Sequence, residues 1–512
     1  MLEQIRLTHP LVYGNFSAIE GGEEHLRALL AIDRYWEQLD CPVPEVVREG
    51  ERPAAEAELS GSFDILYAGG TLGMLHAAVM AKRYGYRVLV IDRGEPARST
   101  RDWNISRSEL HRLADTGVFT IEELDSFILR SYRTGWVEFH VPEARRKRLF
   151  MDGVLDCAVD ADKLLALAMR KVLETEGSKV MARTSFISCS RFADHVEVEA
   201  AGPDGSQLRF GAKVLVDAMG IVSPVAMQLN RGQPQTHVCP TVGTIASGFE
   251  DADYDVGEIL ASTEPAEIFP GGGRQLIWEG FPAKGDEYIT YLFFYDSVDS
   301  PNDKSLLGLF ETYFRKLPTY KEPGAGFAIH RPVYGIIPAY FHDGAGCTRV
   351  VSDDRILLLG DAASLASPLT FCGFGSMVRN LERLTSGLDR ALRHGTLDRE
   401  TLAGVSAFEH NVSSMANLMK YMCFDARTDE PDFVNELMNE VMIVLDALPL
   451  RYRQAMFRDE LKLDELVTVM LRVAWRYPRI LKATWDKLGV QGSVGFLRNL
   501  AGWAMSPSTK HS

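Results

Sequence analysis

The sequence has 512 residues, of which 46% are hydrophobic and 24% charged, as in globular proteins with room for several domains. Its net charge of −15 argues against a general nucleic-acid-binding protein, because phosphate binding needs a basic face. No apolar run approaches the roughly 18 residues of a membrane-spanning helix. The N-terminus carries charge early and lacks an apolar signal core, so we expect a cytoplasmic location.

The cysteines are few, odd in number and scattered, and none forms a Cys-x-x-Cys pair. This pattern predicts reduced thiols and no metal site. They are Cys41, Cys157, Cys189, Cys239, Cys347, Cys372 and Cys423.

The first 60 residues are expected to form an N-terminal extension and linker. One amphipathic helix is predicted over residues 23–39. The stretch that follows, residues 41–60, is rich in proline, glutamate and alanine, and is predicted to be a linker or an extended covering strand.

A βαβ unit is predicted from residue 64 onward. Residues 64–68 form a short apolar run of strand length, and a glycine turn follows. A helical stretch then covers about residues 71–84, ends at Gly85, and leads to a second apolar strand at residues 87–91.

The turn of this unit carries a glycine-rich dinucleotide motif. Glycines allow the backbone to approach a pyrophosphate, helix N-terminal amides face its charge, and the last glycine lets helix and strand pack closely. An acid at the end of the second strand can accept hydrogen bonds from ribose hydroxyls. The alternative is a glycine-rich turn without a ligand, and Ala68 departs from the usual first glycine. The candidate residues are Gly69, Gly70, Thr71, Leu72, Gly73 and Asp92, with Arg93 beside the acid and Arg107 in the loop that follows.

A second motif lies far along the chain, where the buried strand at residues 355–359 leads into Gly-Asp-Ala-Ala. This segment resembles the Gly-Asp segment of FAD proteins. The resemblance implies that the aspartate binds the ribityl chain and that a Pro…Gly-x-Gly stretch passes the flavin ring. The two motifs together predict FAD as the cofactor. The corresponding residues are Gly360, Asp361, Pro368, Gly373, Phe374 and Gly375.

The predicted fold class is α/β: a Rossmann-like FAD-binding domain with a parallel sheet, a mainly antiparallel inserted substrate domain and a helical C-terminal region. We expect the FAD-binding domain at 61–235 and 345–395, the β-rich domain at 236–344 and the helical region at 396–512. Among the strand signals are the alternating residues 196–200 and the aromatic run 288–295.

The loop after the second strand resembles one particular family of FAD proteins. With the glycine motif, Asp-Trp-Asn-Ile-Ser-Arg-Ser-Glu-Leu at 102–110 is similar to lycopene cyclases of the CruA/CruP type, within the superfamily of FAD-binding hydroxylases, geranylgeranyl reductases and lycopene cyclases. Met219 and Ser364 stand where hydroxylases usually carry Asp and His. The similarity covers about residues 62–390, and its further matching segments are 278–282, 334–338 and 367–379.

This resemblance implies a redox-neutral cyclisation of linear lycopene, in which an acid protonates the terminal double bond. It also implies reduced FAD that stabilises the cation, with NAD(P)H only as an external reductant. Glu279 is our candidate acid, because an apolar pocket would keep a carboxyl protonated near neutral pH. The alternative is a carboxylate that caps a turn or pairs with a cation such as Arg274.

Several aromatic residues could line a polyene tunnel, although each is more often part of a core. His330-Arg331 could contact phosphate or flavin, or could form a surface ion pair. The candidate aromatics are Trp278, Phe281, Tyr291, Phe293, Phe294 and Phe374.

The C-terminal stretch at residues 466–505 combines basic residues with tryptophans and many aliphatics. It suggests an interfacial helix pair that would associate peripherally with the inner membrane, or a helical cap that packs on the domain core.

Three functions stay open: the cyclase, an FAD-dependent reductase or hydroxylase of another hydrophobic substrate, and a flavin-binding accessory protein of a carotenoid pathway. No motif indicates an oligomeric state.

Overall fold

Five parallel strands form the centre of the nucleotide-binding half, in the order β9–β3–β2–β12–β22. The computed structural model describes residues 2–39, 41–261, 267–269, 272–370 and 373–506. The strands read as apolar runs because both sheet faces are covered. Helices α4, α7 and α10 pack on one face, and the β10–β11 hairpin and α8 contribute to the core on the other. The strand bounds are β2 Gly61–Ala68, β3 Val88–Ile91, β9 Lys179–Met181, β12 Gln207–Asp217 and β22 Ile356–Leu358.

The α/β class predicted from the sequence is confirmed, and the predicted βαβ unit is present as β2, α4 (Leu72–Lys82) and β3. The first half of β12 pairs with an antiparallel extension of the sheet, while its second half pairs with β22. The remaining elements of this half are β1 Val47–Glu49, β10 Ser185–Arg191, β11 Val196–Ala201, β21 Ser352–Asp353, α7 Ala161–Leu173, α8 Pro224–Leu229, α10 Gly373–His394 and α11 Arg399–Ala403.

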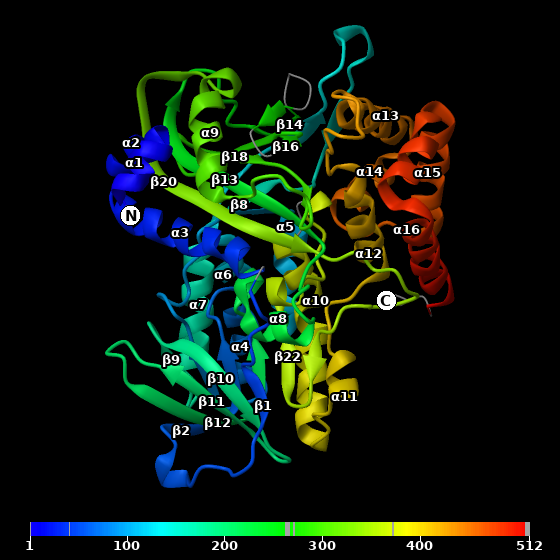
Figure 1. The fold of residues 1–512 in the computed structure, drawn as a ribbon. Coiled ribbons are helices and arrows are strands. Elements are labelled where there is room, and N and C mark those ends of the chain that lie inside the picture. Colours follow the sequence, from blue (N-terminus) through cyan, green and yellow to red (C-terminus); the bar gives the residue numbers. More distant parts are fainter. Residues whose placement is uncertain (1, 40, 262–266, 270–271, 371–372, 507–512) are drawn as a thin grey trace.

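A second, eight-stranded sheet lies above the first (Figure 1). Its strand order is β20–β13–β18–β17–β14–β6–β7, with β19 pairing the first residues of β13 on the β18 side, and all pairings are antiparallel except β14–β6. Strands β6 and β7 come from the segment that the sequence predicted to belong to the nucleotide-binding domain. The bounds are β6 Thr134–Glu138, β7 Arg148–Met151, β13 His237–Phe249, β14 Val256–Ala261, β17 Ile277–Pro282, β18 Glu287–Phe293, β19 Asp296–Ser297 and β20 Pro323–Ala339.

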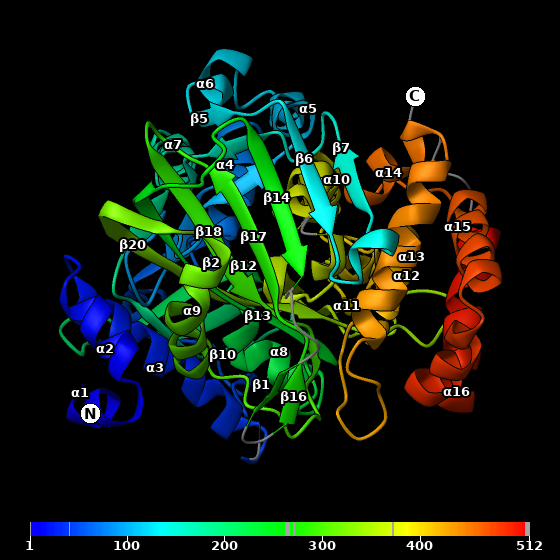
Figure 2. The same ribbon diagram turned by 90° about the horizontal axis from the view of Figure 1, so that it is seen from above.

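The N-terminal segment forms three helices where the sequence predicted one. Helices α1 (Leu2–Thr8), α2 (Pro10–Ser17) and α3 (Gly22–Gln38) pack with α9 (Leu306–Tyr320) on one face of the antiparallel sheet. The stretch predicted as a linker contributes β1, which pairs with β10. Seen from above, these helices and the C-terminal helices lie on opposite sides of the molecule (Figure 2).

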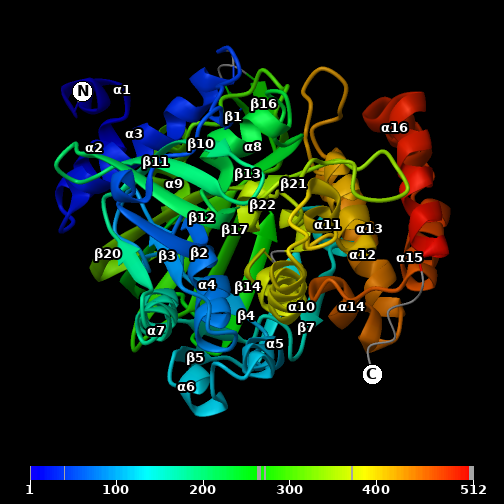
Figure 3. The same ribbon diagram turned by 90° about the horizontal axis from the view of Figure 1, so that it is seen from below.

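The C-terminal region is helical, as predicted, and packs on the other face of the antiparallel sheet. Figure 3 shows α15 and α16 at the edge of the molecule, away from the parallel sheet. Among the described residues, no helix combines the length and apolarity that crossing a membrane requires. The helices are α12 His410–Leu418, α13 Phe433–Ala447, α14 Leu450–Phe457, α15 Leu463–Arg476 and α16 Arg479–Met505.

Smaller elements connect the two halves. The three-stranded sheet β4–β8–β5 lies beside the nucleotide-binding core, and β15 pairs with β16. Their bounds are β4 Trp103–Ile105, β5 Ile128–Ser131, β8 Cys157–Val159, β15 Glu267–Phe269 and β16 Gly272–Arg274, with the short helices α5 Arg107–Leu110 and α6 Ile121–Asp125. The six cysteines in the described part of the chain are free, and Cys372 lies outside it. The described residues contain no cluster of candidate metal ligands.

Candidate functional site: a pocket between the two sheets

The turn between β2 and α4 is built so tightly that two of its glycines cannot carry a side chain. Gly69 has φ +106°, and a Cβ there would lie 2.2 Å from the carbonyl oxygen of Ala218. A Cβ on Gly73 would lie 2.7 Å from the Cβ of the same alanine. The turn therefore presses against the end of β12, and it leads directly into the N-terminus of α4, where Thr71 is the N-cap residue and Leu72 the first helical residue.

Asp92 ends β3 at the same edge of the sheet and holds this turn. Its carboxylate accepts hydrogen bonds from the amides of Gly70 and Gly94, both at 2.7 Å. The structure thus brings together the glycine residues and the acid predicted to bind a dinucleotide. Arg93 is exposed beside them.

The second predicted motif reaches the same region from the other side. Gly360 follows β22 with φ +61°, a conformation that favours glycine. Asp361 comes next, and its Oδ2 lies 3.2 Å from Nη2 of Arg101. Pro368 opens a 3₁₀ turn, and α10 begins at Gly373, with Gly375 buried in its first turn.

A pocket opens where these segments meet the antiparallel sheet. Leu72, Asp361, Pro368, Gly373 and Phe374 line it from the nucleotide-binding half. The opposite wall consists of sheet residues, and they are Cys239, Thr241, Glu279, Tyr291, Phe293 and Ile337. Trp103 stacks on Phe374 at the pocket, with ring centroids 4.2 Å apart.

Glu279 is the carboxyl of the antiparallel sheet that faces this pocket. Its side chain is buried on β17, and Asn104 Nδ2 donates a hydrogen bond to its Oε1 at 2.8 Å. Burial raises the pKa of Glu279 to about 7, although the hydrogen bond from Asn104 acts in the opposite direction. A carboxyl with such a pKa holds a proton near neutral pH and can release it to a substrate. Within the part of the chain that the structure describes, Glu279 forms no ion pair with Arg274, the alternative considered from the sequence; the Arg274 guanidinium lies over the Phe294 ring, 4.7 Å from its centroid.

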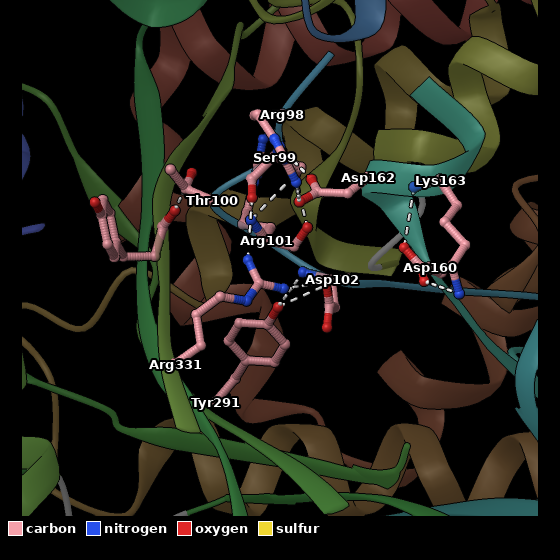
Figure 4. Close-up of polar contacts among 11 residues, drawn as sticks. Arg98, Ser99, Thr100, Arg101, Asp102, Asp160, Asp162, Lys163, Tyr291 and Arg331 are labelled. Carbon is pink, nitrogen blue, oxygen red and sulfur yellow. Dashed lines mark hydrogen bonds and ion pairs between the residues drawn. The ribbon is translucent and has the colours of Figure 1, made fainter. Parts of the chain in front are cut away.

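The loop at residues 98–102 forms polar contacts with both halves of the molecule (Figure 4), and its Arg101 and Asp102 line the pocket. Arg331 of β20 points into this loop, where its guanidinium donates to Asp102 Oδ1 at 2.5 Å and to the Ser99 carbonyl at 3.1 Å. The Tyr291 hydroxyl donates to the Asp102 carbonyl at 3.0 Å. Of the two roles considered for Arg331, an ion pair is what the structure contains. Burial raises the pKa of Asp102, and Arg331 opposes that shift.

Four residues considered from the sequence do not line this pocket. Arg107 lies on α5 outside the pocket, where its Nη2 pairs with Asp125 Oδ2 at 2.8 Å, and its contact to FAD stays a prediction. Trp278 and Phe294 belong to the core on the opposite face of the sheet, because neighbouring residues of a strand point to opposite sides. Phe281 lies in the core beside Tyr291 and does not line the pocket.

Two functional positions were missed from the sequence. Arg101 is the cation beside Asp361, and Asn104 is the hydrogen-bond donor to Glu279. Both lie in or next to the loop segment quoted for the family resemblance, which was a usable signal. Their partners are 260 and 175 residues away in the chain, so no local pattern could have identified them.

The departures from hydroxylase motifs have local structural roles. The Met219 amide donates a hydrogen bond to Asp217 Oδ1 at 3.0 Å. Asp217 is a buried carboxyl, and burial raises its pKa to about 6. Ser364 has φ +49°, and its hydroxyl donates to the Asp361 carbonyl at 3.0 Å.

Comparisons with known proteins identify the fold. No family model matches the sequence, and no curated protein matches it. Among solved structures, a geranylgeranyl bacteriochlorophyll reductase-like protein from Thermoplasma acidophilum matches with a TM-score of 0.57 and 15% identity, over 83% of this chain and 99% of the other.

Two further solved structures have other activities. The halogenase PltM in complex with phloroglucinol and FAD matches with a TM-score of 0.54 and 16% identity, over 86% of this chain and 96% of the other. The p-nitrophenol 4-monooxygenase PnpA from Pseudomonas putida matches with a TM-score of 0.52 and 15% identity, over 78% and 99%. At these identities the likeness shows the fold alone, and none of these structures is a lycopene cyclase. The chain therefore has the fold shared by this reductase-like protein, the FAD-binding halogenase and the monooxygenase.

Proposed function

We propose that this protein is an FAD-dependent oxidoreductase that reduces or hydroxylates an apolar, unsaturated substrate, with Glu279 as its proton-transfer residue. The observation that carries the proposal is the position of Glu279. This buried carboxyl, with a pKa of about 7, lines the same pocket as Asp361, Pro368 and Phe374.

The residues fit FAD. Gly69 and Gly73 let the turn pack directly against Ala218 at the end of β12, and α4 begins there with amides that can face a pyrophosphate. Asp92, at the end of β3, would accept hydrogen bonds from the ribose. By the family resemblance, Asp361 would hold the ribityl chain. The halogenase structure in complex with FAD supports FAD as the cofactor, because it shares the fold.

The chain's own residues define the chemistry. Bound FAD would supply hydride transfer, and an external reductant such as NAD(P)H would return the flavin to its reduced form. The pocket offers the substrate the apolar faces of Tyr291, Phe293 and Phe374. Glu279 would deliver a proton to a substrate carbon, and Asn104 would keep the carboxyl oriented through its hydrogen bond. Burial excludes water and keeps the acid protonated until the substrate accepts the proton.

A second candidate is cyclisation of a linear carotenoid, as in the CruA/CruP-type cyclases that the sequence resembles. The same acid favours it, because protonation of a terminal double bond would start the reaction. Rings of Tyr291, Phe293 and Phe374 could offer π faces to a developing cation. The names of the three structural neighbours favour redox chemistry, so we rank cyclisation second.

The mass of the product separates these functions. The full chain, reconstituted with FAD and given NAD(P)H, would be incubated with lycopene and with geranylgeranyl compounds. Reduction adds two hydrogen atoms, and hydroxylation adds one oxygen atom from dissolved O2 while the other becomes water, each with stoichiometric NAD(P)H use. Cyclisation leaves the mass unchanged and consumes none. An accessory protein would bind FAD and change no substrate.

The matched variants are Glu279→Gln and Glu287→Gln, the latter on the neighbouring strand β18. We expect both to retain flavin absorbance and only the first to lose turnover, by at least about 100-fold. Full turnover by Glu279→Gln would show that Glu279 is not the proton-transfer residue. Failure of the wild-type chain to retain FAD would overturn the proposal that the protein is an FAD-dependent enzyme.

A further inference from the structure

The two C-terminal helices α15 and α16 expose an unusual amount of apolar surface. More than half of the large hydrophobic side chains that are exposed in the described residues lie between residues 467 and 505. Trp475 is 84% exposed, Trp485 is 64% exposed and Leu471 is 66% exposed. Folded proteins rarely leave apolar side chains grouped in this way unless the surface meets a partner or a membrane.

These side chains follow helical spacing. Leu471 and Trp475 are four residues apart on α15, as are Leu481 and Trp485 on the first part of α16. Gly489, with φ +59°, interrupts α16, and Val490, Val494 and Leu497 continue on its second part. Each helical segment therefore exposes one apolar stripe.

The stripes are additional to the faces that hold the helices in place. Val469, Val473, Leu488 and Phe496 are buried in the core of the antiparallel sheet. The helices are apolar on both sides, so packing within the chain does not account for the outer stripes.

The basic residues around the stripes are only partly ion-paired within the chain. Arg476 pairs with Glu440, Arg479 with Glu436, Lys482 with Asp486 and the buried Lys487 with Asp429. The chain carries a net charge of −15, yet the segment between residues 466 and 505 contains a single acid, Asp486. Arg472 and Arg498 are exposed and form no ion pair within the part of the chain that the structure describes. The basic residues of this segment are Arg472, Arg476, Arg479, Lys482, Lys487 and Arg498.

We propose that α15 and α16 dock on the surface of an anionic lipid bilayer, with their apolar stripes in the headgroup region and their cations on lipid phosphates. Exposed tryptophans prefer this interface because their rings are amphipathic. The inner faces of the same helices share a core with Tyr291 and Phe293, which line the pocket. Docking would therefore bring an apolar substrate dissolved in the bilayer close to the half of the protein that holds the pocket. The proposal rests on the surface alone and does not depend on the proposed function.

Flotation of the full chain with vesicles tests the proposal. The vesicles are phosphatidylcholine alone, or phosphatidylcholine with about 30 mol% phosphatidylglycerol. We expect flotation with the anionic vesicles and at least about tenfold weaker binding to the neutral ones, because both the stripes and the cations contribute.

Two double variants address the stripes and the cations separately. Trp475→Ser/Trp485→Ser and Arg472→Glu/Arg498→Glu should each weaken binding at least about tenfold. Their controls change exposed residues of the same kind elsewhere and should bind like the wild type. These controls are Leu173→Ser/Ile187→Ser for the apolar pair and Arg52→Glu/Arg390→Glu for the cations.

Unchanged thermal melting of all variants would show that the fold is intact. Absence of flotation, or equal flotation of the tryptophan variant and the wild type, would overturn the proposal. It would also be overturned if sedimentation showed a wild-type dimer that the tryptophan variant abolishes, because a second copy of the chain would then cover the stripes.

Discussion

Replacing Glu279 by glutamine should stabilise the protein at alkaline pH and change its stability little at acid pH. Burial raises the pKa of Glu279 from 4.5 to about 7. A carboxyl whose pKa is higher in the native state binds its proton more tightly there than in the unfolded chain. Its contribution to stability is fully present below pH 4.5 and is lost as the pH rises through about 7.

The difference between these two pKa values corresponds to about 3 kcal/mol of native-state destabilisation once the carboxyl is ionised. Ionisation of Glu279 destabilises the native state by less than about 1 kcal/mol at pH ~5 and by nearly the full amount at pH ~8.5. Glutamine has the same shape, carries no charge and can accept the hydrogen bond from Asn104 through its side-chain oxygen. The variant should therefore exceed the wild type by about 3 kcal/mol at the higher pH and by under about 1 kcal/mol at the lower.

Urea unfolding of the wild type, Glu279→Gln and the control Glu287→Gln at both pH values measures this difference. Other buried carboxyls with raised pKa values, Asp33, Asp217 and Asp459, are present in all three proteins and cancel in the comparison. If wild type and Glu279→Gln lose stability in parallel as the pH rises, then Glu279 is not a buried, protonated acid, and the proton-transfer role loses its basis.

Three further predictions concern the cofactor and the acid. Gly69→Ala should cost at least about 2 kcal/mol of stability and abolish flavin absorbance. The φ of residue 69 is positive, and a Cβ there would meet a backbone oxygen. A stable variant that retains bound flavin would contradict this prediction. Asn104→Leu removes the donor that favours the ionised carboxyl, so the alkaline limb of the pH–activity profile, which reports Glu279, should move up by about one pH unit. A shift to lower pH would show that water had replaced the amide. Arg101→Met should raise the dissociation constant of FAD about tenfold, measured by flavin fluorescence, whereas Arg98→Met, whose ion pair is exposed, should not; equal effects would place Arg101 outside the cofactor site.

Local sequence patterns determined the parts of this fold whose physics is local. The apolar runs of β2, β3 and β22 were recognisable because strands covered on both faces carry hydrophobic residues throughout. The glycine turn was recognisable because Gly69 and Gly73 are required by close backbone approach within one βα unit. The helical character of the C-terminal region also followed from local periodicity.

Tertiary structure alone decided which side chains meet. A strand pattern shows that Trp278 and Glu279 point to opposite faces, but only the packing of the sheet shows that Glu279 faces the pocket. The pairs Arg101–Asp361 and Asn104–Glu279 join segments far apart in the chain. The sequence does not show that these residues lie close together, because the distance between them is set by how the two sheets pack on each other.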